Sequence, residues 1–237
     1  MIGIIGGAGV AATNKLCQLI EEKYTQNGAF RDAHHPEMII WQATQAPSRS
    51  MYYEGRGDSF IPDYIRIGLS LKQMGATRLA MCCNTAHMAI TELENGIGLP
   101  FINLLEAVAK EVHRKGVHRV GIMCSDGLAK RRVYDQYILN ASPSVEIVYP
   151  TQEYQAKVTA GICNAKNSKR YLPQNNPEHP HSLFSEVCDH LARNEVDCIL
   201  AGCTDILNVF DPAFIHVSYI DSLRVLSDAI ISSIHDS

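Results

Sequence analysis

The chain lacks any run of about 18 or more apolar residues, so the sequence predicts no transmembrane helix and no membrane partner. Charge of one sign is not in large excess either, because 21 Lys and Arg residues face 25 Asp and Glu residues and leave a net charge of −4. Without a basic surplus we expect no nucleic-acid partner.

No basic leader precedes the apolar Ile2, Ile4 and Ile5, and the glycine-rich segment 6–9 ends their run. We therefore expect no signal peptide and predict a cytoplasmic location.

Metal-binding cysteine pairs are also lacking, since none of the eight cysteines belongs to a Cys-x-x-Cys motif. Cys82 and Cys83 are adjacent and point in different directions in an extended chain, which disfavours a shared zinc ion. The sequence therefore predicts no metal site. For a chain without an export signal we expect all eight thiols to be reduced.

The chain does contain enough apolar residues for a substantial core, with 46% hydrophobic and 19% charged among 237 residues. Short apolar stretches alternate with longer amphipathic ones, which is typical of a mostly parallel sheet covered by helices on both faces. The expected strands are 1–5, 38–41, 79–82, 117–123, 145–149 and 198–201, and the expected helices are 13–26, 61–74, 86–94, 128–139, 182–193 and 222–234.

The pattern repeats once along the chain. From Gly3, in the first strand, to Cys83 is 80 residues, and from Gly121 to Cys203 is 82 residues. This near-equal spacing favours an internal duplication over chance similarity between two βαβ segments. We therefore predict an α/β fold of two similar Rossmann-like halves, residues 1–98 with 210–237 and residues 99–209, with the active site in the cleft between them. The polar, proline-containing segment 164–181 is too long for a standard connection, and such loops are either functional lids or simply mobile.

Two strand ends carry a cysteine followed by polar residues, at 83–87 and 202–205. Ligands of parallel α/β sheets bind beyond the carboxyl ends of the strands. A cysteine at this position meets the positive end of the next helix, which favours its thiolate form. Any single cysteine is more often a buried core residue, as we expect for Cys17, Cys188 and Cys198. One strand-end cysteine with polar followers in each half instead indicates a pair of opposed acid/base groups.

The Cys-Asn-Thr-Ala-His motif at 83–87 and the Gly-Cys-Thr-Asp motif at 202–205 resemble the paired signatures of the aspartate/glutamate racemase superfamily. The glycine-rich opening at 2–9 is similar to that of its aspartate racemase branch, and the histidine of the first motif favours the same branch. The resemblance covers nearly the whole chain in order and spacing.

The resemblance implies a cofactor-independent racemase of aspartate or a related amino acid, which uses neither pyridoxal phosphate nor a metal. One of Cys83 and Cys203 would act as a thiolate that removes the α-proton, and the other as a thiol that protonates the opposite face. The implied partner is a small amino acid, and members of this type are often homodimers. Family positions that hold the α-carboxylate and amino group are matched by Asn84, Thr85, Ser125 and Thr204. Each of these four residues would alternatively serve as a helix cap.

The resemblance also suggests two cations for substrate binding. Arg49 lies in a segment similar to the family loop that supplies an arginine, where it would bind a side-chain carboxylate. Lys166 follows a segment similar to the one that carries a substrate-binding lysine. Either residue would alternatively be an ordinary surface cation.

His87 and Asp205 complete the two motifs and are candidates for tuning the thiols, although His87 would otherwise ligate a metal or cap a packed helix.

Four departures from the family pattern put aspartate specificity in question. Ser48 stands where aspartate racemases usually have Asp, Asp205 stands where Glu is commoner, residues 7–10 lack the usual Met-Gly-Pro, and the polar loop after Lys166 is elaborated. The alternatives on the same scaffold are a related cysteine-dependent isomerase or decarboxylase of a small dicarboxylate and a non-enzymatic amino-acid sensor. A dinucleotide-binding oxidoreductase also matches the Gly-x-Gly-x-x-Ala of residues 7–12, but the second expected strand does not end in the acidic residue that holds a ribose.

Overall fold

The structure is a computed structural model that describes residues 1–210, 212 and 215–235. The chain divides into two compact units, Met1–Leu104 with Leu223–Ser237 (unit 1) and Leu105–Ser222 (unit 2). None of the helices in the described part of the chain has both the length and the apolar character needed to cross a bilayer.

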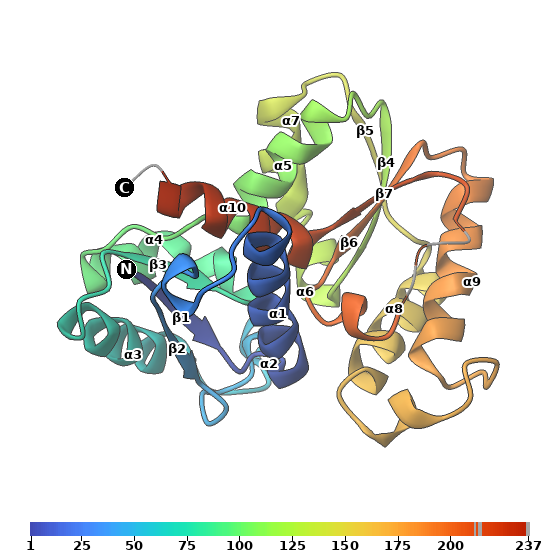
Figure 1. Ribbon diagram of the computed structural model, residues 1–237. Coiled ribbons are helices and arrows are strands. Elements are labelled where there is room, and N and C mark those ends of the chain that lie inside the picture. The colour runs from blue at the N-terminus through green and yellow to red at the C-terminus, as the bar shows by residue number, and fades with distance from the viewer. Residues whose placement is uncertain (211, 213–214, 236–237) are drawn as a thin grey trace. The chain divides into compact units, whose positions relative to one another are not determined.

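Unit 1 is built on a three-stranded parallel sheet in the order β2-β1-β3 (Figure 1). The strands are β1 (Ile2–Gly6), β2 (Met38–Gln42) and β3 (Arg78–Met81). Helices α1 and α3 lie on opposite faces of this sheet, as right-handed crossovers require for this strand order. The helices are α1 (Val10–Gln26), η1 (Asp32–His34), α2 (Arg49–Tyr53), α3 (Ile61–Gln73), η2 (Thr85–Ala89), α4 (Ile90–Ile97) and α10 (Ser222–His235).

Unit 2 contains a four-stranded parallel sheet in the order β5-β4-β6-β7. Its strands are β4 (Arg119–Cys124), β5 (Glu146–Val148), β6 (Cys198–Gly202) and β7 (Ser218–Asp221). The two sheets confirm the predicted α/β architecture, and β7 is an added strand that the sequence analysis did not predict. The helices are α5 (Leu104–Arg114), α6 (Asp126–Lys130), α7 (Val133–Ala141), α8 (Gln152–Asn164), η3 (Ser168–Tyr171), α9 (Pro180–Arg193) and η4 (Ile206–Asn208).

The two glycines that marked the repeat lie on the central strands and serve the same packing purpose. A Cβ atom on Gly3 would lie 2.7 Å from the Leu79 side chain and 3.2 Å from Leu71 of α3. A Cβ atom on Gly121 would lie 3.1 Å from Leu191 of α9. In both units a helix therefore packs a leucine directly onto the backbone of the central strand.

The strands read as continuous apolar runs because helices bury both of their faces. All five residues of β1 and all five of β6 are buried. Each unit has its own core cluster, which includes Ile5, Tyr64 and Leu79 in unit 1 and Phe184 and Ile199 in unit 2.

Several helix boundaries differ from the prediction. The helix expected at 128–139 is two helices, because Arg132 adopts a left-handed conformation with φ 48° between α6 and α7. The helix expected to start at Ala86 begins instead with the 3₁₀ turn η2, and α4 starts at Ile90. Helices α5 and α8 were not predicted.

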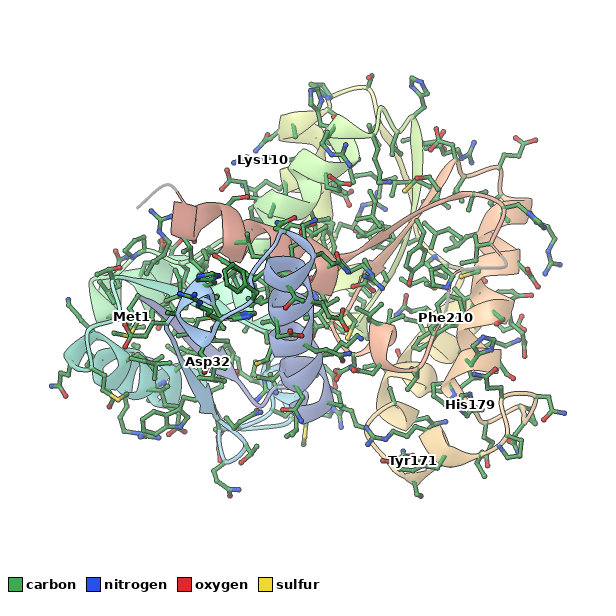
Figure 2. The ribbon with its side chains drawn as sticks, viewed as in Figure 1. Met1, Asp32, Lys110, Tyr171, His179 and Phe210 are labelled. Carbon is green, nitrogen blue, oxygen red and sulfur yellow. The ribbon has the colours of Figure 1, made fainter. Side chains whose placement is uncertain are left out.

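The polar segment 164–181 is anchored at both ends. Asn164 donates a hydrogen bond from Nδ2 to the Glu178 carbonyl at 2.7 Å. His179, labelled in Figure 2, is buried at the start of α9. Its Nδ1 accepts a hydrogen bond from the His181 N–H at 3.0 Å, and its Nε2 lies 3.1 Å from the Arg170 carbonyl. Tyr171, between these anchors, is 75% exposed. These hydrogen bonds hold the connection between α8 and α9 at both ends.

Candidate active site

Cys83 lies at the carboxyl edge of the unit 1 sheet. The strand β3 ends at Met81, and the Cys82 N–H extends its pairing by donating to the Ile5 carbonyl at 3.1 Å. Cys82 is buried, whereas Cys83 is partly exposed. Asn84 and Thr85 follow, and both are buried at the start of η2. The chain turn after the strand thus presents one thiol to solvent and brings two polar side chains next to it.

His87 supports this turn from inside. It is 1% exposed, and its Nδ1 lies 2.8 Å from the Cys83 carbonyl while its Nε2 lies 3.4 Å from the Ile102 carbonyl. Burial lowers the pKa of the His87 imidazole, and the two carbonyl oxygens partly oppose this change. We assign the proton of the neutral ring to Nδ1, the nitrogen with the shorter contact, which donates to Cys83. His87 therefore holds the backbone of the cysteine in place.

This burial predicts a pH dependence of stability. The unfolded chain protonates His87 near its ordinary pKa of about 6.5, whereas the folded protein does so only at lower pH. The contribution of the buried neutral His87 to the free energy of unfolding is therefore complete above about pH 6.5. It is lost as the pH falls toward the lowered pKa of the folded state. We expect wild type to lose more free energy of unfolding between pH 7.5 and pH 5.5 than His87→Asn, measured by urea denaturation. Replacing the exposed His118 by Asn is the control, and equal losses in wild type and His87→Asn would contradict the expectation.

Arg49 is the first residue of α2, a short helix in the connection that follows β2. Ser48 is the N-cap of this helix and accepts a hydrogen bond from the Met51 N–H at 3.4 Å. Arg49 is half-buried, and one guanidinium N–H donates to the Pro47 carbonyl at 3.1 Å. Ser48, which departs from the family pattern, thus has a local structural role as the cap.

Tyr64 is a buried residue near Arg49 and Cys83 that the sequence does not single out. It lies in the first turns of α3 and is completely buried. Burial raises the pKa of its phenol, Arg49 lowers it, and the thiols of Cys83 and Cys82 raise it further. Arg49 and Cys83 therefore both lie within electrostatic reach of Tyr64 in unit 1. An aromatic residue on the apolar face of an amphipathic helix is indistinguishable from a core residue in the sequence.

Cys203 occupies the corresponding position in unit 2. It follows Gly202, the last residue of β6, and is partly exposed, while Thr204 and Asp205 behind it are buried. The Cys203 Sγ lies 3.9 Å from Asp205 Oδ2, which accepts the thiol hydrogen. In both units a partly exposed thiol thus follows the end of a buried parallel strand.

Lys166 forms an ion pair with Asp205. The Nζ–Oδ2 distance is 2.8 Å, and the Asp205 side chain is only 4% exposed compared with 44% for Lys166. A buried carboxylate needs such a partner, because an unpaired charge in a protein interior is costly. Unit 2 therefore brings Cys203, Asp205 and Lys166 together. The lysine follows Ala165, the C-cap of α8, a helix that was not predicted.

The backbone is closely packed at the point where the turn after β6 begins. A Cβ atom on Gly202 would lie 2.9 Å from the Tyr134 ring and 3.1 Å from the Cys124 Cβ, so only glycine fits there. Burial, followed by the neighbouring Cys203, raises the pKa of the Cys124 thiol. Cys124 therefore stays a neutral thiol at neutral pH.

The remaining predicted residues can be compared with the capping alternative. Asn84 is the N-cap of η2 and Ser125 is the N-cap of α6, but neither side chain accepts a hydrogen bond from its helix. Neither residue is therefore explained by capping. Within the described residues there is no group of three or more His, Cys, Asp or Glu side chains arranged to hold a metal ion.

The profile of the Asp/Glu/Hydantoin racemase family matches residues 3–230. The chain belongs to this family. A Bacillus subtilis (strain 168) protein named broad specificity amino-acid racemase RacX is 24% identical over 238 residues, which cover 98% of this chain and 97% of the relative. The Picrophilus torridus aspartate racemase has a TM-score of 0.83 at 24% identity, over 99% of this chain and 94% of that one. An aspartate racemase homologue from Pyrococcus horikoshii OT3 has a TM-score of 0.70 at 19% identity, over 99% and 98%.

Membership of the Asp/Glu/hydantoin racemase family confirms the predicted family and makes the protein an enzyme of the isomerase class. The solved racemases share its two-sheet α/β fold, which confirms the predicted fold class.

Proposed function

We propose that this enzyme racemises amino acids by a two-base mechanism in which Cys83 and Cys203 are the acid/base residues. The observation that carries the proposal is that each sheet ends in a partly exposed thiol at the equivalent strand, β3 in unit 1 and β6 in unit 2. Inversion at a carbon requires one group on each face of it, and a duplicated fold supplies two such groups.

In the proposed reaction one cysteine, as thiolate, removes the α-proton, and the other, as thiol, delivers a proton to the opposite face. The cysteines exchange roles in the reverse direction. Charge that develops on the substrate carboxylate must be stabilised by fixed donors. We assign this role to Asn84, Thr85, Ser125 and Thr204, of which Asn84, Thr85 and Thr204 are buried. No added pyridoxal phosphate or metal takes part in this scheme.

Two further residues act through the cysteines. His87 fixes the backbone carbonyl of Cys83, and Asp205 accepts the thiol hydrogen of Cys203, so each is proposed as a positioning residue. Lys166 in turn holds the Asp205 carboxylate.

The ion pair between Lys166 and Asp205 bears on which amino acids the enzyme accepts. Since the charge of Lys166 is compensated by Asp205, we assign the binding of a substrate side-chain carboxylate to Arg49 alone. A site with one cation for the side chain should accept neutral amino acids as well as aspartate and glutamate, with the acidic ones preferred. The printed name of the Bacillus subtilis relative, a broad specificity amino-acid racemase, supports this wider range.

The experiment that tests the function is a panel of L- and D-amino acids in deuterated water. The protein is first dialysed against a chelator and assayed without pyridoxal phosphate, and loss of the α-proton signal is followed by NMR. We expect exchange and inversion of aspartate and of a smaller set of neutral amino acids. Full activity only after pyridoxal phosphate or a metal is added, or no exchange with any amino acid, would refute the proposal.

A further inference from the structure

The hydroxyl of Tyr64 is buried in unit 1 without a hydrogen-bond partner among the described residues. The residue is 0% exposed, and its ring packs edge-to-face on Phe60 with 5.0 Å between ring centroids. Tyr64 belongs to the core cluster against which Cys83 packs from the edge. The ring is thus held rigidly, and the hydroxyl at its tip has a fixed position.

A buried hydroxyl without a partner calls for an explanation, because most buried polar groups in proteins are paired. Phenylalanine would fill the same volume against Phe60 and would leave no polar atom unsatisfied. Packing alone therefore does not account for a tyrosine here. A group that binds from outside the chain would account for it.

The surroundings indicate which group this is. Burial raises the pKa of the phenol, so it remains a neutral hydrogen-bond donor, and the groups that act on it electrostatically are Arg49, Cys83 and Cys82. The nearby cation is also a donor, since a guanidinium has no acceptor atoms. An uncharged O–H and a guanidinium beside a thiol together suit an acceptor with negative charge and more than one oxygen, which is a carboxylate.

We propose that the Tyr64 hydroxyl donates a hydrogen bond to a carboxylate of the amino-acid substrate bound beside Cys83. This assignment makes Tyr64 a further substrate-binding residue of unit 1, and it rests on the proposed function. The carboxylate is either the α-carboxylate or that of an acidic side chain, and the choice of test compounds distinguishes the two.

The test measures binding through protection of Cys83 and does not require turnover. Wild type, Tyr64→Phe and Tyr52→Phe are treated with iodoacetamide at increasing L-aspartate or L-alanine, and alkylation of the Cys83 peptide is measured by mass spectrometry. Tyr52→Phe is the matched control, because Tyr52 also packs on Phe60, at 5.7 Å, but is only half-buried. Thermal unfolding checks that Tyr64→Phe is folded, and we expect its melting temperature to equal or exceed that of wild type.

We expect Tyr64→Phe to need about tenfold or more L-aspartate for half-protection, as for the loss of one hydrogen bond to a charged group. The alkylation rate without amino acid should stay unchanged, and Tyr52→Phe should behave as wild type. If protection of Cys83 by L-alanine weakens to the same extent in Tyr64→Phe, the hydrogen bond is assigned to the α-carboxylate. If only protection by L-aspartate weakens, the bond is assigned to the side-chain carboxylate. In turnover the KM should rise more than kcat falls.

Other results would overturn the assignment. Equal protection of wild type and Tyr64→Phe would show that the hydroxyl does not contact the amino acid. A changed alkylation rate without amino acid would show that Tyr64 acts on the thiol instead. No protection of wild type by either compound would also overturn it. Protection of wild type without racemisation would refute the proposed function while leaving the Tyr64 assignment intact.

Discussion

Replacing either Cys83 or Cys203 by serine is expected to lower the racemisation rate by about 10²–10⁴-fold, the usual contribution of a positioned general acid or base. Serine has nearly the same size as cysteine but is a far weaker base at neutral pH. Both thiols are partly exposed at strand ends, so the substitutions should leave the cores of the two units intact. Chiral chromatography of L-aspartate incubated with each variant gives the rates.

The control is Cys163→Ser, which removes an exposed thiol on α8 that has no role in the proposed mechanism. It should racemise at the wild-type rate. If Cys83→Ser or Cys203→Ser did the same, that cysteine would be a bystander, and a one-base isomerase or decarboxylase would explain the site better.

Replacing Arg49 by alanine is expected to remove the preference for acidic amino acids. A hydrogen bond to a charged group contributes about 1.5–3 kcal/mol, and its loss corresponds to roughly a tenfold to hundredfold fall in kcat/KM for aspartate. Turnover of a neutral amino acid should change much less, because it has no side-chain carboxylate to bind. The informative quantity is the ratio of the kcat/KM values for aspartate and alanine in the variant and in wild type.

Arg56→Ala is the matched control, since Arg56 lies in the same loop region, is largely exposed and pairs with Glu54. We expect it to leave the ratio unchanged. A similar loss on aspartate and alanine in Arg49→Ala would assign Arg49 a structural role, consistent with its bond to the Pro47 carbonyl.

The parts of the fold that could be predicted are those that depend on local pattern. Parallel strands buried on both faces produce short apolar runs, and β1, β4 and β6 lie within about two residues of their predicted bounds. The two glycines that marked the repeat also have a structural role, because Gly3 packs against α3 and Gly121 against α9. Helix α8 was not predicted because its apolar residues are mixed with polar ones on most sides, so its periodicity is weak.

The parts of the site that could not be predicted depend on contacts between distant residues. Lys166 was assigned to the substrate by resemblance, but its ion pair with Asp205 depends on how α8 ends relative to the turn after β6. The tuning role expected of His87 stays a prediction, and the contact of its ring with the Cys83 carbonyl depends on the geometry of the turn, which the motif does not encode. The position of Tyr64 near Arg49 and Cys83 depends on how α3 packs over the sheet, which no local pattern encodes.

The most direct test of the two-base mechanism is α-proton exchange by the two single cysteine variants with each enantiomer separately. The enantiomers of aspartate are incubated in deuterated water with Cys83→Ser or Cys203→Ser, and the α-proton signal is followed by NMR. A remaining thiol can still remove and return the proton on its own face, so exchange should survive without efficient inversion. We predict that one variant exchanges L-aspartate and the other D-aspartate. The same enantiomer preference in both variants would contradict the proposal that Cys83 and Cys203 act on opposite faces of the α-carbon.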